Sequence, residues 1–571
     1  MILHHVSYKI PMRIIFAHGD FFITAFVWQT NIYIYFCKNF YNENFSTMET
    51  RKYPVDTYTF EKIINGNYIY IDKTDMVYKM THDYRYVFLS RPRRFGKSML
   101  CSTLKEYFNG NKDLFRGLII DSLEKDWTKY PVLNISFADA KDVTENSINA
   151  IINIMLENFE KDFELGKSSD DCGVRFSELI KNISKKTGQK VVVIIDEYDA
   201  AMLDAIHDDN LQERVRAIQN KFFSPLKKLD EYIRFVFITC ITKFSQMSIF
   251  STLNNLQDIS LMPEFETVCG ISHDELLTTL KPDIQAFADK NGFSVEQTLK
   301  YFKTKYDGYN FSPEMHGVFN PFSLMKSLNE KVLKDFWFDS GTPSSLLKLI
   351  AKFDIQMEDF DGIECGASRF CQPVEKITDL VPFLFQAGYL TIKDYRIYAD
   401  EENVMQFYTL GYPNGEVKTS LATSLFSNYY NAADNTPLKL AFIEFKRTYD
   451  LETFMEALKK FFRRFPFSLN NMNEKHYHSV LYTLFTSVGA KVSANVETAL
   501  GKSDLLLRMP KKNYIIELKY DQSVQSALDQ IDDRDYKAAF LEEEKPVIKL
   551  AIKFSSNTRN IESYEAVEEK F

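Results

Sequence analysis

The sequence of 571 residues contains 69 lysines and arginines against 78 aspartates and glutamates, which gives a formal charge of −9 at pH 7. At roughly 150 residues per domain, this length predicts about three or four domains, and a hydrophobic content of 45% excludes a wholly disordered chain. The acidic balance argues against a protein that coats nucleic acid through its overall charge, so any such contact requires a local basic groove. Seven scattered cysteines without a CxxC pair indicate reduced thiols, and we expect a cytoplasmic protein without a disulfide framework or a zinc site.

The first segment of the chain differs in composition from the rest. Residues 14–36 are rich in aromatic and β-branched side chains, and their length would suffice for a membrane span, which needs about 20 apolar residues. Polar side chains that are costly in lipid interrupt the stretch: His18, Asp20, Gln29 and Asn31. We expect residues 1–47 to be an N-terminal extension outside the fold, without stable membrane association. A membrane-tethered sensor is the alternative interpretation of this stretch.

Residues 48–271 alternate apolar β-rich runs with longer helical patterns, which is typical of a parallel α/β sheet. The expected strands cover 86–90, 132–137, 191–196 and 233–240, and helices are expected at 97–108, 148–163 and 211–229. Residues 272–465 follow a mainly helical pattern, and we refer to them as the middle region. Residues 466–571 change again, to a helix, a pair of strands and a second helix.

A nucleotide site is predicted where the first expected strand meets the following helix. Gly96-Lys97-Ser98 opens that helix, and in a phosphate loop the backbone N–H groups there face the phosphates. Lys97 would reach the terminal phosphates of ATP, and the Ser98 hydroxyl would bind Mg²⁺. Arg91 stands where the general motif has its first glycine. The predicted ATP-binding residues of this loop are Arg94, Phe95, Gly96, Lys97, Ser98 and Met99.

The strand at 191–196 supplies the second half of this site. It ends in Asp196-Glu197, so Asp196 would hold Mg²⁺ and Glu197 would polarise the attacking water. A single Asp-Glu pair also commonly ends a strand at the surface, but both motifs in the expected order on one sheet favour a P-loop ATPase of the additional-strand type. Thr239, at the polar end of the strand 233–240, is a further candidate for contact with the γ-phosphate.

The sequence between 501 and 522 predicts a second site. A hairpin that is symmetric about Pro510-Lys511 places Asp504 opposite Glu517, and directly opposed residues share one face of the sheet. Lys519 lies two residues beyond Glu517 and points to the same face. Two carboxylates and an ammonium group suit Mg²⁺ and hydrolysis of a phosphodiester, with Asp504 and Glu517 as metal ligands and Lys519 beside the reacting group.

Motifs spread along the chain resemble one protein family. RPRRFGKS at 91–98, IDEYD at 195–199, YDGYNFS at 306–312, GTPSSLL at 341–347 and GYPNGEV at 411–417 are similar to those of the AAA-ATPase-like proteins. The resemblance extends from about Met48 to the C-terminal end. A degenerate phosphate loop is usual in that family, and it implies that Arg91, Arg93 and Arg94 add positive charge around the triphosphate, unless they form a solvated loop.

The C-terminal pattern D-x12-E-x-K resembles the PD-(D/E)XK nuclease superfamily. That resemblance implies Glu474 as an additional acid, and Gln530 with Tyr536 on a flanking helix. The family pattern places a glutamate near Asn495 and an arginine at Lys502, so metal affinity or activity is expected to be reduced unless Glu497 substitutes. His476 and His478 are interpreted as core or surface residues.

The predicted fold is therefore a P-loop ATPase parallel sheet, a mainly helical middle region and a C-terminal α/β nuclease-like domain. ATP and Mg²⁺ are the expected cofactors, and DNA or RNA the expected partner. We expect a nuclease whose activity depends on the nucleotide state. The alternative is an ATP-binding regulatory protein whose nuclease-like domain binds nucleic acid without cutting it.

Overall fold

The computed structural model describes residues 13–17, 20–24 and 51–569, apart from 244–249, 251–252, 254, 340–345, 347–348, 351–355, 372–377, 401–402, 429–435, 465–472, 542 and 544. Within the N-terminal extension, β1 (Arg13–Ala17) and β2 (Asp20–Thr24) pair as an antiparallel hairpin. The rest of the predicted stretch 14–36 lies outside the described residues. In the part of the chain that is described, none of the helices combines the length and apolar character that a membrane span requires.

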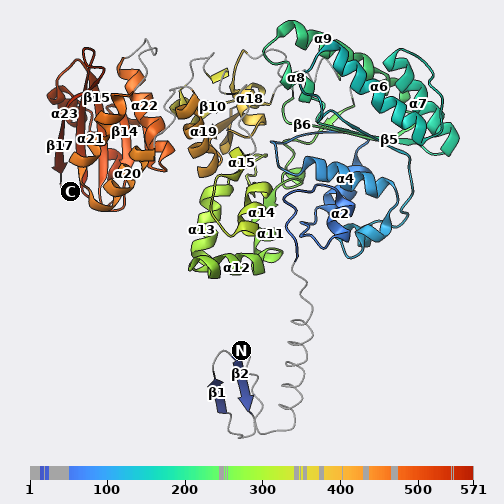
Figure 1. Ribbon diagram of the computed structural model, residues 1–571, viewed down its shortest axis with the longest axis horizontal. Helices are drawn as coiled ribbons and strands as arrows, with labels where there is room; N and C mark the ends of the chain where they lie inside the picture. The colour runs from blue at the N-terminus through green and yellow to red at the C-terminus, as the bar shows by residue number, and fades with distance from the viewer. Residues whose placement is uncertain are drawn as a thin grey trace.

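The first large sheet is parallel and five-stranded, as the sequence predicts. Its strands run in the order β4-β5-β6-β3-β7 and are β3 (Tyr86–Ser90), β4 (Val132–Ser136), β5 (Val191–Asp196), β6 (Ile233–Cys240) and β7 (Gln257–Asp258). Every residue of β3 and β5 is buried, because helices cover both faces and leave no polar side to the sheet (Figure 1). β6 lies between β5 and β3, which is the additional strand that the sequence predicts.

The helices of this part carry the connections between parallel strands. They are α2 (Phe60–Asn65), α3 (Thr74–Asp83), α4 (Lys97–Phe108), α5 (Ile119–Leu123), α6 (Glu145–Asp162), α7 (Cys172–Thr187), α8 (Ala200–Asp204) and α9 (Asp209–Phe223). α4 has the predicted bounds, and α6 covers the expected helix at 148–163. The structure adds α7, whose buried face packs against α9.

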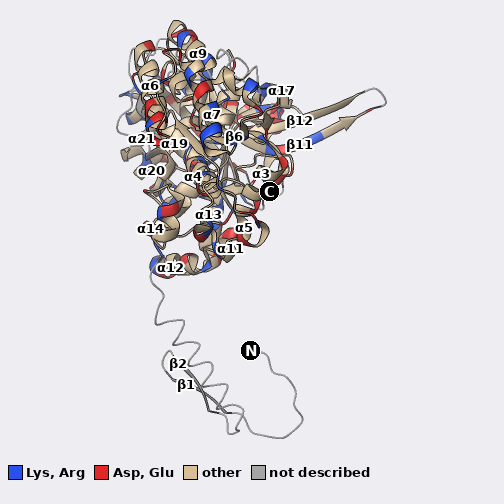
Figure 2. Cartoon of the chain, turned by 90° about the vertical axis from the view of Figure 1, so that its right-hand side faces the viewer, with Lys and Arg blue, Asp and Glu red and all other residues tan. Residues whose placement is uncertain are grey.

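The middle region is mainly helical, as predicted. Its helices include α11 (His273–Thr278), α12 (Lys281–Asn291), α13 (Val295–Tyr306), α14 (Pro321–Glu330), α15 (Phe336–Asp339), α18 (Val381–Gln386), α19 (Gly415–Asn428), α20 (Thr436–Thr448) and α21 (Leu451–Phe462). A three-stranded sheet, β10-β12-β11, interrupts them: β10 (Ile363–Cys365), β11 (Thr391–Ala399) and β12 (Val404–Gly411). β11 and β12 form an arm that projects from the body of the molecule (Figure 2).

The C-terminal part is built on a second five-stranded sheet, in the order β13-β14-β15-β16-β17. The strands are β13 (Lys491–Thr498), β14 (Gly501–Arg508), β15 (Asn513–Tyr520), β16 (Val547–Ser555) and β17 (Asn560–Glu569). The sequence predicts only the β14–β15 pair; β15 and β16 are parallel and the other pairings antiparallel. α22 (Glu474–Ser487) and α23 (Val524–Asp533) are the two predicted helices, and α21 also packs on this sheet. The middle region lies between the two sheets (Figure 1).

Candidate functional site

The phosphate loop joins the end of β3 to α4. Gly96 precedes the first helical residue with a left-handed φ of 99°, and Arg94 is also left-handed at 66°. This conformation favours glycine and lets the chain turn directly into the helix N-terminus. The Lys97 ammonium group donates to the carbonyl oxygens of Arg91 at 2.9 Å and Pro92 at 3.0 Å. The loop therefore holds its lysine in place without a ligand.

A cavity of about 1040 Å³ opens above this loop. Its lining includes the predicted residues of the phosphate loop and of the end of β5: Arg94, Phe95, Gly96, Lys97, Ser98, Met99, Asp196 and Glu197. Thr242 also lines it, whereas the Thr239 side chain is fully buried beneath and its hydroxyl has no described partner. The cavity has the size class of small-molecule sites.

Asp196 is the last residue of β5 and faces this cavity. Burial raises the pKa of its carboxyl group, although a hydrogen bond from Ser98 and the charge of Lys97 oppose the shift. Its Oδ1 atom is buried and has no hydrogen-bond partner among the described residues. An unpartnered carboxylate oxygen next to the Ser98 hydroxyl fits Mg²⁺, which takes hard oxygen ligands.

One functional neighbour of this site was missed from the sequence. The buried Asp199 carboxylate accepts hydrogen bonds from the backbone N–H of Thr242 at 2.8 Å and of Ile241 at 3.1 Å, and from the Thr242 hydroxyl at 3.1 Å. Burial raises the pKa of Asp199 to about 6. Asp199 thereby ties the end of β5 to the end of β6. Asp199 is the second aspartate of the IDEYD motif at 195–199, and that motif is the feature of the sequence that could have identified it.

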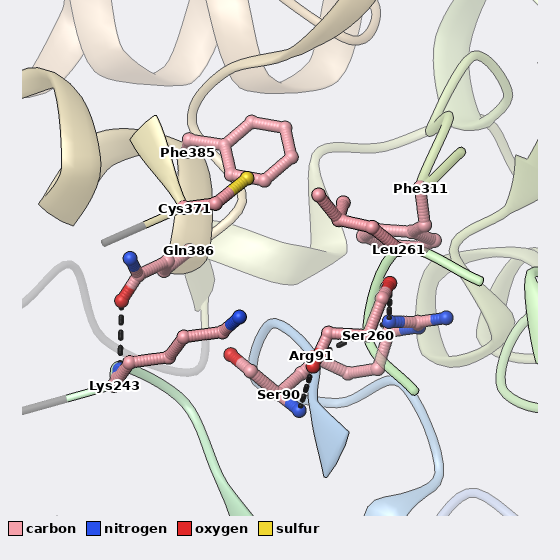
Figure 3. Close-up of a pocket in the computed structure, with 9 residues that line it drawn as sticks. All are labelled: Ser90, Arg91, Lys243, Ser260, Leu261, Phe311, Cys371, Phe385 and Gln386. Atoms are coloured by element: carbon pink, nitrogen blue, oxygen red, sulfur yellow. Dashed lines mark hydrogen bonds between the residues drawn. The ribbon is translucent and has the colours of Figure 1, made fainter. Parts of the chain in front are cut away.

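The structure corrects the expected role of Arg91. Its guanidinium group is buried and donates to the carbonyls of Ser90 at 2.9 Å, Ser260 at 2.7 Å and Phe265 at 3.0 Å (Figure 3). It also lies 4.1 Å from the centre of the Phe311 ring. Arg91 lines a separate cavity of about 20 Å³ and not the large cavity above the loop, so it braces the loop from behind.

The middle region contacts the phosphate loop directly. The Trp337 indole N–H donates to the carbonyl of Arg93 at 3.2 Å, and the Arg94 guanidinium lies 4.7 Å from the centre of the Phe322 ring. An added Cβ at Gly388 would approach Pro92 to 2.6 Å. These contacts pack side chains of the middle region against the phosphate loop at the rim of the large cavity.

The C-terminal candidate site lies where β14 and β15 run side by side. Their register pairs Leu505 with Ile516 and Arg508 with Asn513, which is the predicted hairpin alignment. Next along the strands, the Asp504 carboxylate accepts a hydrogen bond from the Leu518 N–H at 2.8 Å. The structure thus brings Asp504 to the end of β15 that carries Glu517.

Lys519 connects the predicted groups of this site. Its ammonium group lies 3.1 Å from Glu517 Oε1, 2.9 Å from Gln530 Oε1 and 4.0 Å from Glu474 Oε1. Gln530 stands on α23 and donates to the Tyr536 hydroxyl at 3.1 Å, while Glu474 opens α22. Side chains of three separate elements, α22, β15 and α23, therefore converge on one lysine.

Both carboxylates of this site are held in a poorly solvated place. Burial and the charge of Asp504 raise the pKa of Glu517 to about 7, and burial also raises the pKa of Asp504. Glu517 is only 1% exposed, and its Oε2 atom has no described hydrogen-bond partner. No three acidic, histidine or cysteine side chains gather as a metal site within the described residues. Two carboxylates fit Mg²⁺, which usually keeps several waters and takes its remaining ligands from substrate phosphates.

The accessory candidate Glu497 lies on β13, opposite Lys502 of β14. The two side chains form an exposed ion pair at 2.7 Å. Because Lys502 and Asp504 are two residues apart on one strand, Glu497 lies on the same face as Asp504. Asn495, where the family pattern has a glutamate, has a left-handed φ of 52°.

His478 has a role that the sequence did not indicate. Its Nε2 atom lies 2.9 Å from the carbonyl oxygen of Asp504, and its Nδ1 atom lies 3.2 Å from Oε1 of Glu358 in the middle region. Burial lowers the pKa of His478, but hydrogen bonding to Glu358 outweighs it and the net shift is upward. His478 therefore joins the carboxylate site to a buried acid of another part of the chain.

The comparisons with known proteins agree with this architecture. A family model described as a predicted AAA-ATPase matches residues 54–250, and one described as the PD-(D/E)XK nuclease superfamily matches residues 472–564. The chain is 30% identical over 534 residues to an uncharacterized protein in the vnfD 5′ region of Azotobacter chroococcum mcd 1, covering 90% of this chain and 98% of the relative. The chain belongs to the family of AAA-ATPase-like proteins that carry a C-terminal PD-(D/E)XK nuclease superfamily domain.

Proposed function

We propose that this protein binds and hydrolyses ATP at the phosphate loop and cleaves nucleic acid at the C-terminal carboxylates with Mg²⁺. One observation carries the proposal. In each site a lysine stands beside a buried carboxylate that keeps one oxygen without a described partner: Lys97 with Asp196, and Lys519 with Glu517. Such oxygens are costly to bury unless a ligand completes them.

At the phosphate loop, each residue has a defined task. The N-terminus of α4 and Lys97 would neutralise the triphosphate, and Ser98 with Asp196 would hold Mg²⁺. Glu197, which follows Asp196 at the edge of the cavity, would orient the attacking water. Lys97 would exchange its two loop carbonyls for phosphate oxygens, so a buried ammonium group would never be left unpaired.

At the carboxylate site, Asp504 and Glu517 would hold Mg²⁺, which when bound lowers the pKa of water and stabilises charge on a phosphate. Lys519 would stabilise the phosphate at the point of cleavage, and Gln530 would keep Lys519 in position. Glu474 accepts a hydrogen bond from the Tyr520 N–H at 3.1 Å and so stands at the edge of the same site.

Regulation by the nucleotide is the third part of the proposal. Trp337 bonds to the phosphate loop through its indole, and its backbone N–H donates to the buried Glu416 at 2.8 Å. Glu416 lies at the start of α19, which packs along α22 of the nuclease-like domain. If the phosphate loop has two positions and ATP binds one of them more tightly, ATP would shift the packing of α19 on α22. The size of that shift is set by the difference between the two affinities.

The test uses the purified full chain with plasmid, single-stranded DNA and RNA, in Mg²⁺ or Mn²⁺, with and without ATP. Cleavage that vanishes in Asp504→Ala and responds to ATP in the wild type but not in Lys97→Ala would support the proposal. Binding of nucleic acid without cleavage, with ATP hydrolysis intact, would favour the alternative of a regulatory protein with a non-cutting nuclease-like domain.

A further inference from the structure

A buried contact joins the middle region to α22 and, through His478, to the strand that carries Asp504. His478 lies on α22, and Glu358 lies on a short 3₁₀ helix, η4 (Met357–Phe360). Their side chains are 8% and 3% exposed, and the distance from His478 Nδ1 to Glu358 Oε1 is 3.2 Å. The Ser479 hydroxyl also donates to Glu358, so two neighbouring residues of α22 hold this carboxylate.

The other nitrogen of His478 holds the backbone of β14 at Asp504. On either side of Asp504, strands β13 and β14 pair through Val496 with Ser503 and through Ala494 with Leu505. Pairing with β15 begins at Leu505. The His478 Nε2 atom, 2.9 Å from the Asp504 carbonyl, supplies a partner at this position. Fixing the carbonyl fixes the backbone at Asp504 and so the direction of its Cα–Cβ bond, while the Leu518 N–H holds the carboxylate itself at 2.8 Å.

Glu358 determines how the ring of His478 is placed. A backbone carbonyl only accepts hydrogen bonds, and so does an ionised carboxylate, so both ring nitrogens must donate. Without an acceptor at residue 358, the Nδ1–H group would be buried without a partner, and such a group is costly. The ring would then shift toward another acceptor and loosen its bond to Asp504.

Glu358 is in turn fixed by the middle region. The Tyr412 hydroxyl donates to the carbonyl of Met357 at 2.9 Å, and Lys418 on α19 lies 3.1 Å from Asp361. These contacts hold both ends of η4 to the end of β12 and to α19. The acid that reaches His478 therefore moves with the middle region.

We propose that Glu358 is a positioning residue for the carboxylate site, acting through His478, so that this site is complete only when the middle region is seated on α22. The proposal rests on the proposed metal-dependent function and deepens it. Outer residues that orient metal ligands typically change metal affinity or activity by about 10- to 100-fold when they are removed.

The experiment measures the Mn²⁺ affinity of the nucleotide-free full chain by electron paramagnetic resonance. Only the Mn²⁺ binding that is lost in Asp504→Ala is assigned to the carboxylate site. Glu358→Leu and Glu358→Gln have similar volumes, but only glutamine can still bond to His478. We expect Glu358→Leu to weaken Mn²⁺ binding about tenfold and Glu358→Gln to stay within about twofold of the wild type. Glu364→Gln, an exposed change on the neighbouring β10, is the control and should have no effect. Equal affinities for the leucine and glutamine variants would overturn the proposal.

A second variant keeps the test decisive if Glu358→Leu does not fold. His478→Gln retains one amide donor for the Asp504 carbonyl but loses the second ring nitrogen that faces Glu358. Glu358→Ala should weaken Mn²⁺ binding about tenfold in the wild type but cause no further change in this background, and a further loss of that size would contradict the proposed path.

The two proposals fail in different ways. A wild-type protein that binds Mn²⁺ but cuts no nucleic acid would contradict the nuclease function. The Mn²⁺ affinities of Glu358→Leu and Glu358→Gln would still test the role of Glu358. A wild-type protein with no Mn²⁺ binding beyond that of Asp504→Ala would overturn both.

Discussion

The phosphate-loop site and the carboxylate site place similar groups, a lysine and a buried carboxylate, but they are assembled differently. The first is built from one continuous stretch, residues 91–99, together with the end of β5, which β6 separates from β3 in the sheet. The second depends on side chains of three separate elements, α22, β15 and α23, that meet at Lys519. A local backbone turn fixes the first site, whereas tertiary packing fixes the second.

The middle region contacts the two sites in correspondingly different ways. At the phosphate loop it bonds to a backbone carbonyl, that of Arg93. At the carboxylate site it bonds to a side chain, His478, that in turn holds Asp504. We therefore expect the carboxylate site to depend more strongly on distant changes, and four predictions test this comparison.

The largest effect is expected from Asp504→Ala, which removes one of the two carboxylates of the second site. Loss of a metal ligand should cost about 4 kcal/mol of transition-state stabilisation, or roughly a thousandfold in cleavage rate. ATP hydrolysis should be unchanged. The exposed Glu565→Gln on β17 is the matched control and should cut normally. Cleavage that survives in Asp504→Ala would locate the active site elsewhere.

Lys97→Ala is expected to act on the first site alone. Without its ammonium group the triphosphate is poorly neutralised, so ATP hydrolysis should fall on the order of a hundredfold. Mn²⁺ binding at Asp504 should persist. Lys185→Ala, an exposed lysine on α7, is the control for a general charge effect. Equal rates of ATP hydrolysis by the Lys97→Ala and Lys185→Ala variants would contradict the proposal that ATP binds in this cavity.

Metal binding at the carboxylate site should depend on pH. Because the pKa of Glu517 is raised to about 7, the group keeps a proton below that pH, and metal binding must displace it. Mn²⁺ affinity should therefore fall by up to about tenfold per pH unit below about pH 7, and this group should add no dependence above it. The same shift makes the metal-free protein gain stability as the pH falls through about 7. Titrations at several pH values with an unchanged affinity would contradict this prediction.

Trp337→Phe should give the smallest effect. It keeps an aromatic ring but loses the indole bond to Arg93, and one hydrogen bond contributes about 1 kcal/mol, or roughly fivefold in an equilibrium. We expect the effect of ATP on cleavage to shrink by about that factor, with cleavage in the absence of ATP unaffected. Trp127→Phe is a matched control, because its indole nitrogen has no described hydrogen bond. An undiminished ATP effect would show that coupling does not pass through Trp337.

Much of the fold could be predicted from the sequence where a pattern is local. β3, β5 and β6 have the expected bounds because each is a short and largely apolar run, and α4 begins at the predicted Lys97. The strands β13, β16 and β17 were missed. β13 has only small apolar side chains at alternate positions, and the polar Ser/Asn segment between β16 and β17 marks a turn without identifying which strands pair around it. Their place in the sheet depends on long-range pairing.

The sequence by itself determined the phosphate loop and the register of the β14–β15 hairpin, because both depend on residues close together along the chain. Only the tertiary structure decided that Arg91 turns away from the nucleotide cavity, that Lys519 meets Glu474 and Gln530, and that Glu358 reaches His478. The physical reason is that a buried charged side chain must be paired, and its possible partners are the groups that pack next to it in the folded protein. Those partners are set by packing between residues that lie 11 to 169 positions apart along the chain.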